Sequence, residues 1–164
     1  MPAAGWSLRS GPGAVIDQVG IPEAIDRGLF AAGTVLRGEW VGHLSQPGRG
    51  RTYEHALRTL TVGGRTFVAP VAPRVPHTAS RPGESPAPDT GAGRASIGVE
   101  RVEPGVVGVG TDHAYLGYLH DGVFDHPAGI VIEPRQVAPD LEAARSRMTD
   151  EMVRALAPVG VRVT

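Results

Sequence analysis

The sequence predicts an α+β fold: an antiparallel sheet of about four strands with two longer helices packed on it, plus a projecting hairpin and a proline-rich loop. Three observations predict it. Apolar residues recur at helical spacing over two stretches, two pairs of strand-like runs each flank a glycine-containing turn, and five prolines punctuate residues 72–92. The 164 residues fit one domain. We expect an N-terminal arm at 1–20 and a single domain at 21–164, with an extended insertion at 52–92.

The first long helix is expected to begin at Ile21-Pro22-Glu23, because proline suits the first helical position and glutamate complements the helix dipole. Its apolar face comprises Ala24, Ile25, Leu29, Ala32, Leu36, Trp40 and Leu44. Four glycines interrupt the helix: Gly28, Gly33, Gly38 and Gly42. Each costs about 1 kcal/mol against alanine, so the helix needs packing partners to persist.

Two further helices follow the same logic. A short one is expected from His113 to His120, with Asp112 as its N-cap and Gly122 at its end. The second long helix begins near Pro139. Its buried stripe comprises Leu141, Ala144, Met148, Met152 and Leu156.

The strongest strand signal is a hairpin whose strands, 57–62 and 65–71, flank Gly63-Gly64, a two-residue turn that allows positive φ. In this register Leu60 faces Phe67 and Val62 faces Arg65. An alternative interpretation places Tyr53–Leu60 in a short helix capped by Thr52. The remaining strands are expected at 95–102, 106–111, 129–133 and 159–163.

Residues 72–92 contain Pro73, Pro76, Pro82, Pro86 and Pro88, which favour an extended, polyproline-like segment. A loop of this length in a small domain is usually functional or disordered. We expect it to reach, together with the 57–71 hairpin, beyond its own domain and to contact a protein partner.

Composition excludes several function classes. The chain has no cysteine, which removes disulfides, thiolate zinc sites and cysteine nucleophiles. A net charge of −1 argues against nucleic-acid binding through a basic field. No apolar run approaches the ~20 residues that span a bilayer, and no signal peptide opens the chain, so we expect no membrane association.

The best candidate for enzymatic chemistry is a histidine and aspartate cluster at residues 112–126, which suggests a small metal-dependent hydrolase using His120, Asp121 and His126. The spacing disfavours it: His113 and His120 lie two helical turns apart, about 10.5 Å along the axis. Ser96 lacks the glycine-flanked elbow of a serine hydrolase. We therefore expect no enzyme activity, no metal and no cofactor.

Two segments suggest a different kind of function. Ser80-Arg81-Pro82-Gly83-Glu84-Ser85-Pro86-Ala87-Pro88-Asp89-Thr90-Gly91 leads into Ala95-Ser96-Ile97-Gly98-Val99, and Val107-Gly108-Val109-Gly110-Thr111-Asp112-His113-Ala114-Tyr115-Leu116-Gly117-Tyr118-Leu119 follows. In this order they resemble the neck or tail-completion proteins of long-tailed phages, the minor tail protein Z-like family. The resemblance covers roughly residues 80–123. It departs from the family pattern at Gly91-Ala92-Gly93-Arg94 and at His120-Asp121-Gly122-Val123.

The resemblance implies a structural virion protein, assembled in the host cytoplasm, that forms a ring, plausibly a hexamer, between the capsid connector and the tail. Its partners would be further copies of itself, a head-closure or connector protein, and a tail terminator or tail tube protein. DNA would pass through without sequence-specific binding. The expected partner-contact residues are Arg74, Arg81, Glu84, Asp89, Leu60, Phe67, Tyr115 and Tyr118. A soluble protein-binding module remains an alternative.

Overall fold

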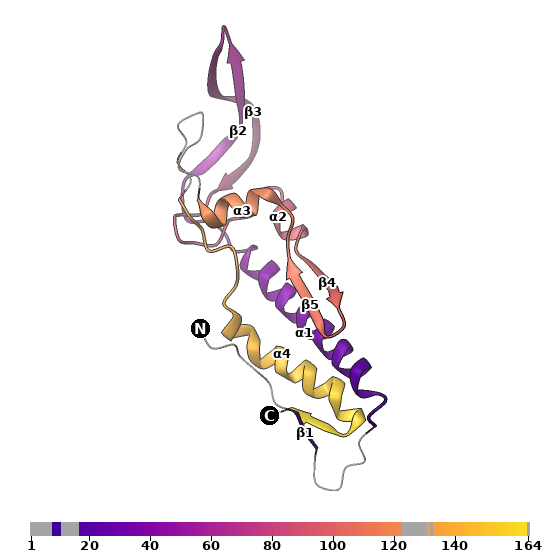
Figure 1. The fold of residues 1–164 in the computed structure, drawn as a ribbon. Coiled ribbons are helices and arrows are strands. Elements are labelled where there is room, and N and C mark those ends of the chain that lie inside the picture. Colours follow the sequence, from indigo (N-terminus) through magenta and orange to yellow (C-terminus); the bar gives the residue numbers. More distant parts are fainter. Residues whose placement is uncertain (1–7, 11–16, 123–130, 132, 164) are drawn as a thin grey trace. The chain divides into compact units, whose positions relative to one another are not determined.

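The computed structural model describes residues 8–10, 17–122, 131 and 133–163. It contains both helices and antiparallel strands, which confirms the mixed fold class (Figure 1). The chain divides into two compact units. Unit 1 comprises Met1–Glu39, Ile97–Gly110 and Asp140–Thr164, and unit 2 comprises Trp40–Ser96 and Thr111–Pro139.

Unit 1 is built on two helices, α1 (Ile21–His43), whose last turn belongs to unit 2, and α4 (Leu141–Leu156). Both begin where the sequence predicts. The Asp140 carboxylate caps α4 by accepting a hydrogen bond of 3.0 Å from the Glu142 N–H. A 3₁₀ turn, η1 (Ala157–Val159), leads from α4 to strand β6 (Val161–Val163).

The core of unit 1 lies between these two helices and the end of the chain. It comprises Ala24, Met152, Leu156, Val159 and Val161, with Ile21, Ile25 and Leu29 packed against it. The expected stripe of α4 is confirmed at Ala144, Met152 and Leu156, whereas Leu141 is exposed.

Two of the four glycines in α1 allow neighbouring elements to pack closely against the helix. A Cβ at Gly28 would lie 2.9 Å from the Met152 Sδ, and a Cβ at Gly33 would lie 2.9 Å from the Val107 Cγ1. Both glycines are buried, so their lack of a side chain lets α1 approach its neighbours closely. Gly38 and Gly42 have open space around them and serve no such purpose.

The neighbour at Gly33 is the hairpin of β4 (Gly98–Glu103) and β5 (Val106–Gly110), which forms where the sequence predicts it. A second pair joins β1 (Leu8–Ser10), inside the expected N-terminal arm, to β6. The third pair, β2 (Thr52–Val62) and β3 (Arg65–Thr78), belongs to unit 2.

The described strands therefore form three separate two-stranded sheets in place of one sheet of about four strands. Each hairpin pairs locally, and the β2–β3 and β4–β5 hairpins belong to different units. The expected strand at 129–133 lies mostly outside the described residues, and Val131 and Glu133 have no regular structure.

Unit 2 contains the β2–β3 ribbon, a short helix α2 (Ala92–Ala95) that the sequence did not predict, and α3 (Ala114–Asp121). The ribbon has the predicted register, with Leu60 opposite Phe67 and Val62 opposite Arg65, and Gly63 and Gly64 both have positive φ. The alternative helix at 53–60 is wrong.

Strand β3 continues to Thr78, through Pro73 and Pro76 of the segment expected to be a loop. A two-stranded ribbon has two open edges, where proline's missing N–H costs no ladder bond. Register shifts between Tyr53 and His55 and between Ala56 and Leu57 interrupt the pairing at this end.

The cap expected for α3 is also wrong. His113 is the N-cap residue and makes no side-chain cap bond, while the Thr111 hydroxyl accepts a 3.0 Å hydrogen bond from the His113 N–H. Gly122 ends α3 with φ 78°, as predicted. No helix among the described residues has the length and apolar character needed to cross a membrane.

Candidate functional site

An open cleft of about 570 Å³ lies in unit 2, and parts of both segments singled out in the sequence line it, between Ser80 and Gly91 in the first and between His113 and Leu119 in the second. One wall is the proline-rich chain from Pro86 to Arg94, including α2, and another is α3. The foot of the β2–β3 ribbon closes the cleft with Tyr53 and His77. Sequence positions far apart thus contribute to one concave surface.

Close packing between α2 and α3 positions these walls. A Cβ at Gly93 would lie 3.2 Å from the Leu116 Cδ2, so glycine allows the two helices to touch. Leu116 and Leu119 are buried, and they fix which side of α3 faces inward. Ser96 joins the helices further, because its hydroxyl lies 2.6 Å from the Thr111 hydroxyl and donates to the Gly93 carbonyl at 2.7 Å.

The proline-rich segment is held to its own unit by main-chain and hydroxyl contacts. The Ser85 hydroxyl donates to the His43 carbonyl at 2.5 Å, the Gly83 N–H to the Pro134 carbonyl at 3.3 Å, and the Gln136 N–H to the Glu84 carbonyl at 3.3 Å. Pro86 is buried. The loop is therefore part of the cleft's framework rather than a free tether.

Glu84 stabilises the turn that starts this segment. Its carboxylate accepts a 2.8 Å hydrogen bond from the Arg81 N–H, while its own N–H donates to the Arg81 carbonyl at 3.1 Å. The hydrogen bond from the Arg81 N–H to the carboxylate, together with hydrogen bonding and charge from Arg49, holds the pKa of Glu84 below its ordinary value of 4.5. The expected partner contact of Glu84 thus has an internal role.

The polar side chains around the cleft are mostly hydrogen-bond donors, with Asp89 as the one carboxylate among the described lining residues. Arg94 donates to the Ser45 hydroxyl at 3.4 Å, and the His113 and Tyr115 rings meet edge to face at 6.4 Å. Two buried nitrogens among the lining residues have no partner in the described structure: His113 Nδ1 and Arg135 Nη1. Such a surface suits a carboxylate- or carbonyl-bearing protein segment.

Two arrangements that would serve hydrolysis are a serine beside an imidazole and a cluster of metal ligands. The Ser96 hydroxyl contacts the Thr111 hydroxyl and the Gly93 carbonyl, and no imidazole of the described residues lies among its partners. Across the described part of the chain, no three His, Asp or Glu side chains are grouped to hold a metal ion. Asp125 and His126 lie outside the described residues, so the complete cluster proposed for the hydrolase is not tested.

The expected partner-contact residues fall at separate places. Asp89 and Tyr115 line the cleft, Tyr118 is 58% exposed on α3 beside it, and Arg81 is exposed in the turn. Leu60 and Phe67 lie instead near the tip of the ribbon. Arg74 lies on β3, and its side chain is outside the described set.

Several polar lining residues, among them His77, Arg94 and Arg135, were not predicted as site residues, and His113 was considered only for a metal site. Arg94 and His113 lie within the region of resemblance, whereas His77 and Arg135 lie outside it, and nothing in their spacing predicts a shared cleft. A local signal did exist for the turn into α2, since Gly91 has a φ of 81°, a left-handed conformation that favours glycine.

Comparison with protein-family models, with curated proteins and with solved structures finds no match for this chain.

Proposed function

We propose that this chain is a structural, non-enzymatic virion protein that assembles into a closed ring at the head-to-tail neck of a long-tailed phage. The observation that carries the proposal is the ribbon tip, where residues 61–68 are all exposed although they include Val62, Phe67 and Val68. Apolar side chains on an exposed ribbon are typical of a surface that another protein covers.

The helix that bears the second family-like segment supports the same conclusion. Tyr115 and Tyr118, three residues apart, are 54% and 58% exposed, while Leu116 and Leu119 face inward. Tyrosine is enriched at protein interfaces because its ring supplies apolar area and its hydroxyl can hydrogen-bond. Unit 2 thus presents two aromatic or apolar surfaces for partners.

In this proposal the copies associate head to tail, the ribbon of one against a different surface of the next. Such heterologous contacts form a ring whenever the rotation between copies closes, plausibly sixfold here. The adjoining layers would be a connector or head-closure protein and a tail terminator or tail tube protein. A net charge of −1 suits a bore through which DNA passes without being held.

The direct test is the assembly state of the purified full chain. Native mass spectrometry and negative-stain electron microscopy should show a closed homo-oligomer, with the tail tube or connector protein added where the chain alone stays monomeric. The double variant Val62→Thr, Phe67→Thr should lose assembly with an unchanged circular dichroism spectrum. A map of the phage particle that contains a single asymmetric copy would overturn the proposal.

The hydrolase alternative needs a separate measurement. Metal analysis after dialysis should find far less than one equivalent of zinc or manganese per chain. Stoichiometric metal that disappears in His120→Ala, accompanied by hydrolysis of a phosphate ester or an amide, would replace the structural function with an enzymatic one.

A further inference from the structure

The tip of the β2–β3 ribbon has two chemically different faces. Because side chains alternate along a strand, the pairs Leu60–Phe67 and Val62–Arg65 lie on one face, which we name the tip face. The opposite face presents Thr61 and Thr66, whose hydroxyls lie 3.2 Å apart. The tip face is thus apolar apart from one arginine, whereas the opposite face carries the two threonine hydroxyls beside Val68.

Arg65 is the only charged residue between Leu60 and Val68. It is exposed, and it makes no ion pair with any residue that the structure describes. An apolar surface with a single unpaired guanidinium predicts a partner surface that is apolar with a single carboxylate.

Unit 1 carries such a surface. A hollow of about 630 Å³ lies between the first turns of α1 and the turn that joins β4 to β5. It is lined by Pro22, Ile25, Asp26, Arg101, Glu103, Pro104 and Gly105.

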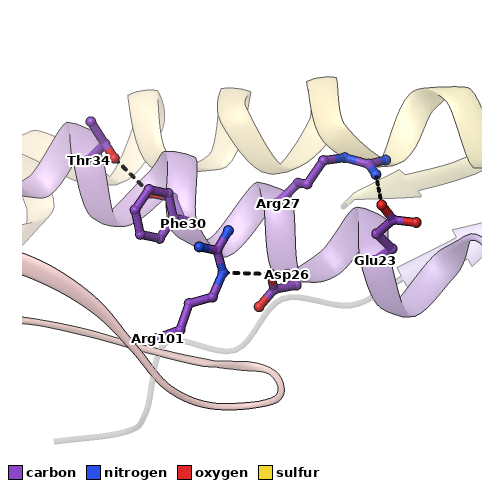
Figure 2. A network of polar contacts seen from close by, with 6 residues as sticks. All are labelled: Glu23, Asp26, Arg27, Phe30, Thr34 and Arg101. Atoms are coloured by element: carbon purple, nitrogen blue, oxygen red, sulfur yellow. Dashed lines mark hydrogen bonds and ion pairs between the residues drawn. The ribbon is translucent and has the colours of Figure 1, made fainter.

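Of the three charged residues that line this hollow, two pair with each other and one carboxylate is left without a partner among the described residues. Arg101 donates to the Asp26 carboxylate at 2.8 Å, and its guanidinium lies 4.2 Å from the centre of the Phe30 ring (Figure 2). These contacts neutralise Asp26 and hold Arg101 in place. Glu103 is exposed and has no partner among the described residues, so it is the free carboxylate at the edge of an apolar hollow.

We propose that the tip face of one copy docks into this hollow on the next copy, with Arg65 paired to Glu103 and the Val62 and Phe67 side chains inside. The inference rests on the proposed ring and names its contact. Donor and acceptor are different surfaces of the same chain, as a head-to-tail contact requires. One ribbon tip buries much less than the ~800 Å² per partner of a stable pair, so closure of the ring must supply the remaining affinity.

The absence of native cysteine gives a clean test by disulfide trapping. Two single variants, Arg65→Cys and Glu103→Cys, are mixed under assembly conditions and oxidised. A disulfide requires Cα atoms within about 7 Å, so a covalent dimer containing one of each variant is expected only if the tip reaches the hollow of another copy. The double variant should give a ladder of covalent oligomers.

Thr66→Cys is the matched control, because it adjoins Arg65 but points to the opposite face of the ribbon. Mixed with Glu103→Cys, it should trap little or no dimer. An intramolecular disulfide in the double variant, or dimers formed by Arg65→Cys alone, would show that the tip binds its own chain or another tip, and either result overturns the inference.

Charge reversal provides an independent measurement. Arg65→Glu should raise the protein concentration needed for half-assembly about tenfold, because like charges would then face one another. The double variant Arg65→Glu, Glu103→Arg should restore it. If rings form, the cysteine pair does not cross-link and Arg65→Glu leaves assembly unchanged, the docking is overturned and the ring stands. If the chain neither assembles nor cross-links at any soluble concentration with its partners present, the ring is overturned as well.

Discussion

Helix α1 and the β2–β3 ribbon use their side chains in opposite ways. Over its 23 residues, α1 buries only small ones: Ala24, Gly28, Ala32 and Gly33. At its tip the ribbon leaves large apolar residues outside, with Val62 65% and Phe67 46% exposed. The helix therefore depends on how closely its neighbours approach, whereas the ribbon depends on its own ladder of hydrogen bonds and on whatever covers it.

The sharpest test of this contrast compares one side chain from each region. Leu156→Ala should lower the free energy of unfolding by about 3 kcal/mol, because Leu156 is fully buried in the core of unit 1 and its truncation leaves a cavity. Phe67→Ala should change it by less than about 0.5 kcal/mol, as expected for an exposed side chain. Denaturant titration followed by far-ultraviolet circular dichroism measures both.

The outcome distinguishes folding from assembly. If Phe67→Ala destabilised the isolated chain as much as Leu156→Ala, the ribbon would have to pack within the chain, and its availability to a partner would be lost. Unchanged stability of Phe67→Ala together with weakened assembly is the result that the ribbon's exposure predicts.

The close approach of α1 can be tested at its glycines. Gly33→Leu should cost about 2 kcal/mol, because even a Cβ there would stand 2.9 Å from the Val107 Cγ1 and 3.1 Å from the Val99 Cγ1. Valine side chains have few alternative rotamers with which to yield. Thermal unfolding should show the loss.

Gly38→Ala is the matched control in the same helix. Nothing lies within 4 Å of a Cβ at this position, so alanine should stabilise the chain by up to about 1 kcal/mol through helix propensity alone. A gain at both positions would mean that α1 does not pack on the β4–β5 hairpin as described.

The same contrast explains what the sequence could predict. The α1 start, the α4 stripe and the ribbon register follow from local rules: proline and glutamate in a first turn, helical spacing, and a Gly-Gly turn that fixes pairing. Local rules treat Gly28 and Gly33 as unfavourable in a helix, because the neighbouring sequence does not indicate that Met152 and Val107 will lie against them. Their role is visible only once the chain has folded.

The candidate site was likewise predictable only in its local parts. The sequence singled out two segments, and parts of both line one cleft, but the lining residues His77 and Arg135 come from outside them. The pairing of Asp26 with Arg101 links positions 75 residues apart, which no spacing rule connects. Whether the strands share one sheet is likewise a question of long-range contacts, and the sequence prediction of about four strands together was not reproduced.

The smallest expected effect concerns the turn at residues 81–84, before the cleft. Polar contacts stabilise this turn, whereas buried apolar side chains stabilise unit 1. The native pKa of Glu84 lies below its ordinary value of 4.5, mainly because its carboxylate accepts the Arg81 N–H. The unfolded chain therefore binds a proton at higher pH than the folded chain does. The resulting stabilisation is fully present above about pH 4.5 and is lost as the pH falls through the lowered native pKa.

Glu84→Gln should accordingly be less stable than the native chain at neutral pH, by a small margin because the carboxylate is solvent-exposed, and the two should converge in acid. Melting temperatures measured across the acidic range test this. Glu84→Asp keeps the charge but shortens the reach to the Arg81 N–H, so it should fall between the two if the hydrogen bond dominates. A Glu84→Asp variant as stable as the native chain would assign the effect to charge from Arg49 and Arg81 instead. A difference that persists unchanged at low pH would show that the glutamine disturbs the turn by its shape, not by the loss of a carboxylate.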